Sequence, residues 1–231
     1  MYNERGYVDI TASNKLLRTS FLYMILGLLV TFSVPAYIIV TRNIGMVYTI
    51  ANYYTFILIA ELITVFVFSA RIHKASLTSA KLMFFFYSFL NGFTFSAIGL
   101  LAIRNLNIVA YTLITTIVMF AVIAAYGYMT NEDLSHYGGF LKTGLISLII
   151  ISLINMFMAA PALYWAVTIL GVVIFSGLIA YDVNRIKNMA YEVTEGDDEL
   201  IGKLGIIGAL NLYLDFLNLF LYLLRIFSKK K

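Results

Sequence analysis

Long apolar runs separated by short polar connections fill most of this chain. An α-helix needs about 20 predominantly apolar residues to cross a bilayer. Seven runs approach or reach that length, namely Ser20–Val40, Tyr53–Ala70, Leu82–Ile103, Ile108–Met129, Phe140–Met158, Ala162–Tyr181 and Leu204–Phe227. We therefore predict an all-α membrane protein with seven transmembrane helices, made of an N-terminal tail at 1–19, one transmembrane domain at 20–227 and a basic C-terminal tail at 228–231.

The composition supports a membrane protein and excludes several other classes. Of the 231 residues, 61% are hydrophobic and only 12% are charged, which is more apolar surface than a soluble domain can bury. The chain has no cysteine, so disulfides and thiolate metal sites are excluded. The net charge of +4 comes with basic residues near the helix ends, which membrane topology explains without a nucleic-acid partner.

The distribution of Lys and Arg predicts a cytoplasmic N-terminus. Ten of the 16 basic residues fall in the tail and in the connections on its side of the membrane. Four of the remaining six, Arg225 and Lys229–Lys231, follow the last apolar run and would lie outside after seven full spans. The alternative is a re-entrant last segment that returns to the cytoplasm, and the length of the last run favours a full span.

The last apolar run carries a polar stripe. Asn211, Asp215, Asn218 and Tyr222 recur at intervals of four, three and four residues, which places them on one face of a helix. A charged residue at the centre of a membrane helix costs at least about 2.5 to 3.5 kcal/mol, so it is normally kept only where it faces protein or water. We therefore expect Asp215 to point into the bundle.

Three acidic residues lie at membrane depth or at its edge: Glu61, Asp182 and Asp215. One interpretation pairs Asp182 with Arg185, three residues further along the same helix. The other brings Asp182 and Asp215 together, because they lie on consecutive antiparallel helices.

Two carboxyl groups within hydrogen-bonding reach in a site of low dielectric cannot both ionise cheaply, so they share a proton and titrate as a unit. Such a pair would sense pH. When both are ionised, Asp182 and Asp215 could also coordinate a hard cation such as calcium. Asn211 and Asn218 could add amide oxygens, or could equally serve in hydrogen bonds between helices.

Paired aspartates on neighbouring helices also occur in intramembrane aspartyl proteases. Here the second aspartate, Asp215, lies in LYLD where a glycine-flanked GxGD is needed, and the tripeptide Pro161–Leu163 precedes Asp182 when it should follow Asp215. No Ser–His or HExxH arrangement offers another hydrolytic route. We expect no enzymatic activity.

Several segments, taken in order, resemble the Bax inhibitor-1 (TMBIM) family in its bacterial inner-membrane branch. They are NKLLRTSFLYMILGLLVT, AELITVFVFSARI, YSFLNGFTFSAI, YGYMTNEDLSHYGGFLKTGLISLIIISLIN, FSGLIAYDVNRIK and LNLYLDFLNLFLYLLRIF. The resemblance covers nearly the whole chain.

The resemblance implies a seven-helix bundle in which two groups of three helices surround a central C-terminal helix. It implies a bacterial inner-membrane location and a pH-sensitive calcium leak, and in eukaryotic members a suppression of cell death. The family's aspartate pair falls on Asp182 in YD and on Asp215 in LYLDF. The arginine that latches the first aspartate maps to Arg71, and the acidic residue of the same helix maps to Glu61.

The leading hypothesis is a cation leak channel for calcium, gated by protonation of the Asp182–Asp215 pair, with Arg71 as the gating cation. Glu61, Asn211 and Asn218 are the further pore-lining candidates. We expect the lipid bilayer and calcium ions as partners and no cofactor beyond calcium as a permeant or bound ion. The alternative is a non-conducting protein that binds and regulates other membrane proteins. A proton-coupled transporter would show inverted repeats, and none is found.

Overall fold

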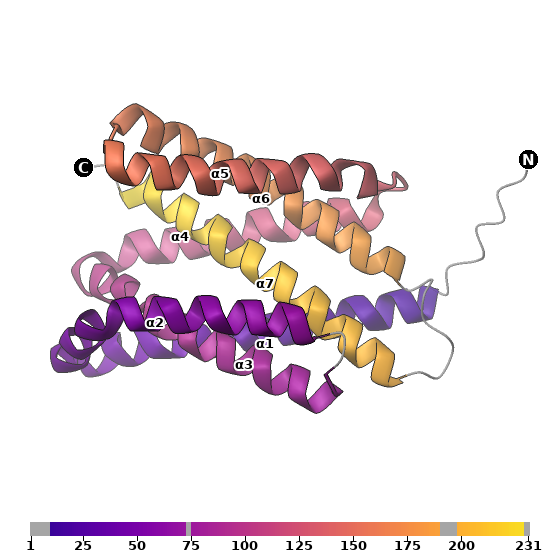
Figure 1. Cartoon of the computed structure of the whole chain (residues 1–231), viewed down its shortest axis with the longest axis horizontal. Coiled ribbons are helices and arrows are strands. Elements are labelled where there is room, and N and C mark those ends of the chain that lie inside the picture. The colour runs from indigo at the N-terminus through magenta and orange to yellow at the C-terminus, as the bar shows by residue number, and fades with distance from the viewer. Residues whose placement is uncertain (1–9, 73–74, 190–197, 229–231) are drawn as a thin grey trace, which may run out of the picture.

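The computed structural model describes residues 10–72, 75–189 and 198–228 (Figure 1). These residues form seven α-helices and one short 3-10 helix, and no strand occurs among them. The helices are α1 (Ile10–Thr41), α2 (Ile44–Arg71), α3 (Leu77–Thr94), α4 (Ser96–Met129), η1 (Leu134–Tyr137), α5 (Gly138–Met158), α6 (Pro161–Met189) and α7 (Asp198–Ser228).

Six of these helices are long and apolar enough to cross a membrane: α1, α2, α4, α5, α6 and α7. The 18-residue α3 is not among them. The predicted third span, Leu82–Ile103, is wrong in its bounds, because α3 ends at Thr94 and the rest of that run belongs to α4. α4 itself is kinked at Asn105, whose backbone is non-helical (φ −154°, ψ 80°) and whose Oδ1 accepts a hydrogen bond from the Ile108 amide at 3.4 Å.

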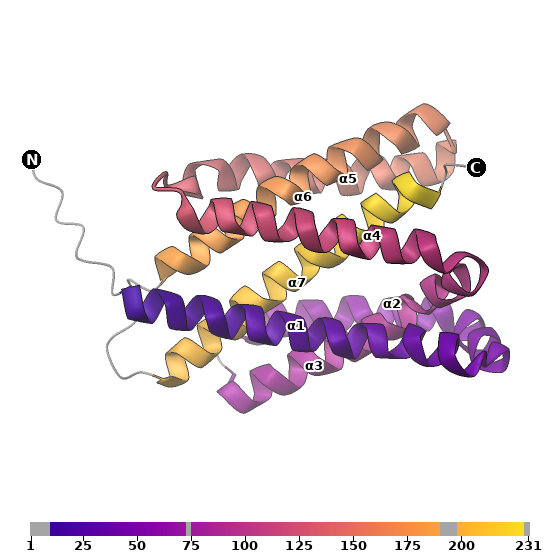
Figure 2. The same cartoon turned by 180° about the vertical axis from the view of Figure 1, so that it is seen from behind.

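α7 is the most buried of the spanning helices. Residues inside the protein make up 67% of its most apolar window, against 39% for α1, the next highest. α7 crosses the molecule diagonally and packs against α1, α3, α4 and α6 (Figures 1 and 2). A buried polar link ties it to α1 and α3, because Thr31 Oγ1 lies 2.6 Å from the Tyr213 hydroxyl and donates to the Ser88 carbonyl at 2.8 Å.

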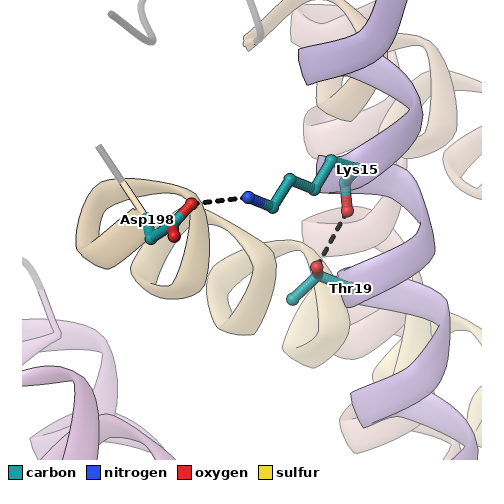
Figure 3. Close-up of polar contacts among 3 residues, drawn as sticks. All are labelled: Lys15, Thr19 and Asp198. Carbon is teal, nitrogen blue, oxygen red and sulfur yellow. Dashed lines mark hydrogen bonds and ion pairs between the residues drawn. The ribbon is translucent and has the colours of Figure 1, made fainter. Parts of the chain in front are cut away.

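The first and the last helix both begin earlier than the apolar runs predict. α1 begins at Ile10 and not at Ser20, because Leu16 and Leu17 are buried in the core. α7 begins at Asp198 and not at Leu204. Lys15 forms an ion pair with Asp198, and Thr19 donates a hydrogen bond to the Lys15 carbonyl (Figure 3). Because both partners of this ion pair are exposed, it fixes a local geometry more than it stabilises the fold.

α6 also continues past its apolar run, through Asp182 to Met189. The predicted long connection, Asp182–Lys203, is therefore wrong at both ends, since residues 182–189 and 198–203 are helical. Val183 and Ile186 are buried, so this polar-looking extension still has an inward face. Most of the acidic run EVTEGDDE lies outside the described residues.

α4 and α6 cross closely at Gly127. A Cβ atom built at Gly127 would lie 2.5 Å from the backbone oxygen of Ala180. The obstacle is backbone, so no side chain can rotate away to make room. This contact fixes the spacing of α4 and α6 two residues from Asp182.

We predict that Gly127→Ala destabilises the protein by about 1 to 3 kcal/mol, because the added methyl group forces α4 away from α6. Thermal unfolding of the detergent-solubilised protein measures the effect as a lower midpoint. Gly139→Ala is the matched control, since its Cβ would meet nothing within 4 Å, and it should be neutral or slightly stabilising. Equal midpoints for the two variants would contradict the close crossing.

Candidate functional site

Asp182 of α6 and Asp215 of α7 meet inside the bundle. Only 7% of Asp182 and 5% of Asp215 is exposed, and the two carboxyl groups are close enough to act on each other electrostatically. A hydrogen bond between them would need a proton on one of the two carboxyls, because two carboxylates offer only acceptors. Asn211, one turn before Asp215, donates from its Nδ2 to Asp182 Oδ1 at 3.5 Å.

The oxygen Asp215 Oδ2 is fully buried, and no N–H or O–H group of the described residues reaches it. A buried acceptor without a donor costs about 1 to 3 kcal/mol, and more when it is charged. A proton held by the carboxyl pair would lower this cost at Asp215 Oδ2. The geometry therefore favours a pair that holds one proton over two separate carboxylates.

A cavity of about 790 Å³ borders the pair. Its lining comes from α2, α3, α5, α6 and α7, and the polar residues of the α7 stripe all line it, namely Asn211, Asp215, Asn218 and Tyr222. α2 and α5 form its apolar sides through residues such as Leu62 and Leu145. The polar stripe and the aspartate pair thus line one cavity.

The cations that act on Asp182 are Arg185 and Lys142, which line the same cavity. Arg185 acts through space, since the described residues contain no direct ion pair between it and Asp182. Arg71 is exposed at the C-terminal end of α2 and is not among the residues that line the cavity or act on Asp182. The structure therefore does not bring Arg71 to the aspartate pair.

Two further predicted residues have partners of their own. Glu61 is half-buried and accepts a 2.6 Å hydrogen bond at Oε2 from the Thr94 hydroxyl of α3, and it does not line the cavity. Asn218 lines the cavity, and its Nδ2 donates to the Leu214 carbonyl of its own helix at 2.8 Å. Glu61 is thus separated from the pair, and Asn218 offers its amide oxygen to the cavity.

Sequence reasoning missed Asn184, which fixes the end of α6 two residues after Asp182. Asn184 is 2% exposed, and its Oδ1 accepts from the Leu134 amide at 3.1 Å. Its Nδ2 donates to the carbonyls of Gly127 and Glu132, each at 3.3 Å. One side chain therefore ties α6 to the end of α4 and the turn that follows. The one sign of this role in the sequence is the place of Asn184 in YDVN, two residues after Asp182.

Lys142 was also missed as a site residue, because the sequence accounts for it as a topology-setting cation. Only the fold shows that it lies on α5 facing α6, where it joins the lining of the cavity beside Asp182.

We predict that Asn184→Ala lowers the free energy of unfolding by about 1 to 3 kcal/mol, because it leaves three backbone groups without their partner. Thermal unfolding in detergent measures the loss. Asn188→Ala is the control, because Asn188 donates only to the Asn184 side chain, at 3.3 Å. A loss for Asn188→Ala as large as that for Asn184→Ala would contradict the assigned role.

Comparison with known proteins identifies relatives over the whole described bundle. The model of the family described as inhibitor of apoptosis-promoting Bax1 matches residues 13–231. The inner membrane protein YbhL of Escherichia coli is 39% identical over 210 residues, which cover 90% of this chain and 89% of YbhL. A protein of Borreliella burgdorferi is 36% identical over 225 residues, which cover 96% of this chain and 95% of that protein.

Proposed function

This chain belongs to the family of inhibitors of apoptosis-promoting Bax1, and from the geometry of its aspartate pair we propose that it is a pH-sensitive cation leak channel of the bacterial inner membrane, with calcium as the permeant ion. Asp182 and Asp215 are the proposed pH sensor and gate. The observation that carries the proposal is the burial of two neighbouring carboxyl groups beside a cavity that the polar stripe of α7 lines.

The proposed topology places the N-terminus in the cytoplasm, with α3 as the seventh span and α7 at the centre of two groups of three helices. Three features support it: the bias of Lys and Arg along the sequence, the packing of α7 against α1, α3, α4 and α6, and the high burial of α7.

The oxygen atoms that could coordinate a cation in the cavity suit an ion that passes through. Calcium takes six to eight oxygen ligands in stable sites. Within the described ranges no three Asp, Glu or His side chains converge on one point, so Asp182 and Asp215 would share the ion with the amides of Asn211 and Asn218 and with water. Such a set attracts a cation without holding it tightly.

Protonation changes the pair in one defined way. With a shared proton, the two carboxyls hold α6 and α7 together through a hydrogen bond. Without it, two negative charges face each other and repel, which weakens that contact and makes the cavity more attractive to a cation. Arg185 and Lys142 are the cations positioned to pair with Asp182 once it separates from Asp215. For Arg71 to act as the latch, α2 would have to approach α6, which it does not contact in this structure.

We predict that Asp215→Asn abolishes the pH dependence of calcium flux, because an amide can donate to Asp182 but cannot release a proton. Flux into proteoliposomes that hold a calcium indicator, measured from about pH 5 to pH 8, tests this. The ratio of the flux at the two ends of the range should fall to about one in the variant, since the pair no longer titrates.

Asp198→Asn is the matched control, because it makes the same chemical change at an exposed position on the same helix. It should keep the wild-type pH profile. A wild-type profile in Asp215→Asn would contradict the sensor. No flux from purified wild-type protein at any pH would favour the alternative, a non-conducting protein that regulates other membrane proteins.

A further inference from the structure

A second polar cavity, of about 700 Å³, lies at the other end of the bundle, between the α5–α6 turn and the end of α7. Its polar lining comes from three helices and consists of Ser152, Asn155, Tyr164, Arg225 and Ser228. Of these five residues, Ser152 alone also lines the cavity beside the aspartate pair. The channel proposed above makes no use of Arg225.

The exposed Arg225 has its guanidinium over two aromatic rings. Its guanidinium carbon lies 5.2 Å from the centre of the Tyr222 ring and 5.8 Å from that of Tyr164. The Tyr222 ring is itself fixed, because it packs on Gly171, where an added Cβ would lie 2.5 Å from the ring, and on Phe175. Stacking of this kind orients the planar guanidinium while leaving the N–H groups at its edge free to bind an anion.

The charge of this cavity is positive. No Asp or Glu occurs among its described lining residues, and Arg225 forms no ion pair within the part of the chain that the structure describes. An unpaired guanidinium in a cavity edged by hydroxyl groups is suited to a phosphate oxygen, which arginine binds through two parallel N–H groups.

Asn155 gives the cavity a second fixed donor. Its Oδ1 accepts a hydrogen bond from the Ala160 amide at 3.0 Å, and its main-chain carbonyl accepts from the Ala159 amide at 2.8 Å. These bonds hold the tight α5–α6 turn, in which Ala159 adopts a left-handed conformation (φ 50°). Because the hydrogen bond at Oδ1 orients the amide group, the Nδ2 group of Asn155 is left to donate to a ligand.

From this arrangement we propose that the cavity binds a phosphate-bearing anion, with Arg225 as the principal ligand and Asn155, Ser152 and Ser228 as supporting donors. The cavity lies where α5 and α7 end and α6 begins, and a bilayer crossed by these three helices would have its headgroups near this level. Tyr164 and Trp165 begin α6 at the same level, as interfacial aromatic residues do. The headgroup of an anionic phospholipid fits this position, and free phosphate shares the same chemistry.

The test compares lipid binding by the purified full-length protein and its variants. Native mass spectrometry counts phosphatidylglycerol molecules that are retained, with zwitterionic phosphatidylcholine as the reference lipid. We expect the wild type to prefer phosphatidylglycerol and Arg225→Gln to bind it about tenfold to a hundredfold more weakly, the effect of losing a charge-assisted pair of hydrogen bonds. Lys81→Gln is the matched control, because Lys81 lies over the Tyr23 ring at 5.4 Å and does not line the cavity.

A second variant and a second ligand complete the test. Arg225→Lys keeps the charge but loses the planar guanidinium, so its affinity for phosphatidylglycerol should fall between those of the wild type and Arg225→Gln. If Arg225→Gln does not fold, weaker binding by Arg225→Lys than by the wild type tests the proposal. Competition by inorganic phosphate alone would identify free phosphate as the ligand, and its failure to compete would identify the lipid headgroup. Equal affinity of wild type, Arg225→Lys and Arg225→Gln, or no preference for phosphatidylglycerol, would overturn the proposal.

Discussion

A carboxyl group inside a membrane protein needs a partner, and the arrangement of α6 and α7 meets that need. Asp215 lies on the most buried helix, and its partner Asp182 lies on a part of α6 that continues well beyond the apolar run. Two acidic groups in such a site cannot both ionise cheaply without a proton or a cation between them. We therefore propose that the contact between Asp182 and Asp215 depends on pH.

The surrounding helices hold this contact in place. Asn184 ties α6 to the end of α4 and the following turn, and Gly127 lets α4 approach α6 closely. Thr31 and Tyr213 link α7 to α1 on the opposite side. If these contacts hold α6 and α7 in place, loss of the shared proton would strain the contact between Asp182 and Asp215. This is the physical basis on which we propose the pair as a gate.

The sequence predicted the helical class, the family and the stripe on α7, because these depend on periodicity and on the high cost of a charge in lipid. It predicted the ends of α1, α6 and α7 poorly, since Leu16, Val183 and Ile186 are buried by packing in polar-looking segments. The break after Thr94 was also missed, because it falls inside an apolar run. The kink at Asn105 falls where the sequence predicted a connection between the third and fourth spans, and the structure shows it as a bend within one helix. The roles of Asn184 and Lys142 depend on contacts between helices far apart in sequence, which no local pattern reveals.

The central claim is that Asp182 and Asp215 hold one proton between them. Infrared spectroscopy of the protein in lipid tests this directly, through the C=O stretch that only a protonated carboxyl group shows. We predict such a band at low pH, its loss as the pH rises, and its absence in the double variant Asp182→Asn/Asp215→Asn. A band that persists in the double variant, or that never appears in the wild type, would contradict the shared proton.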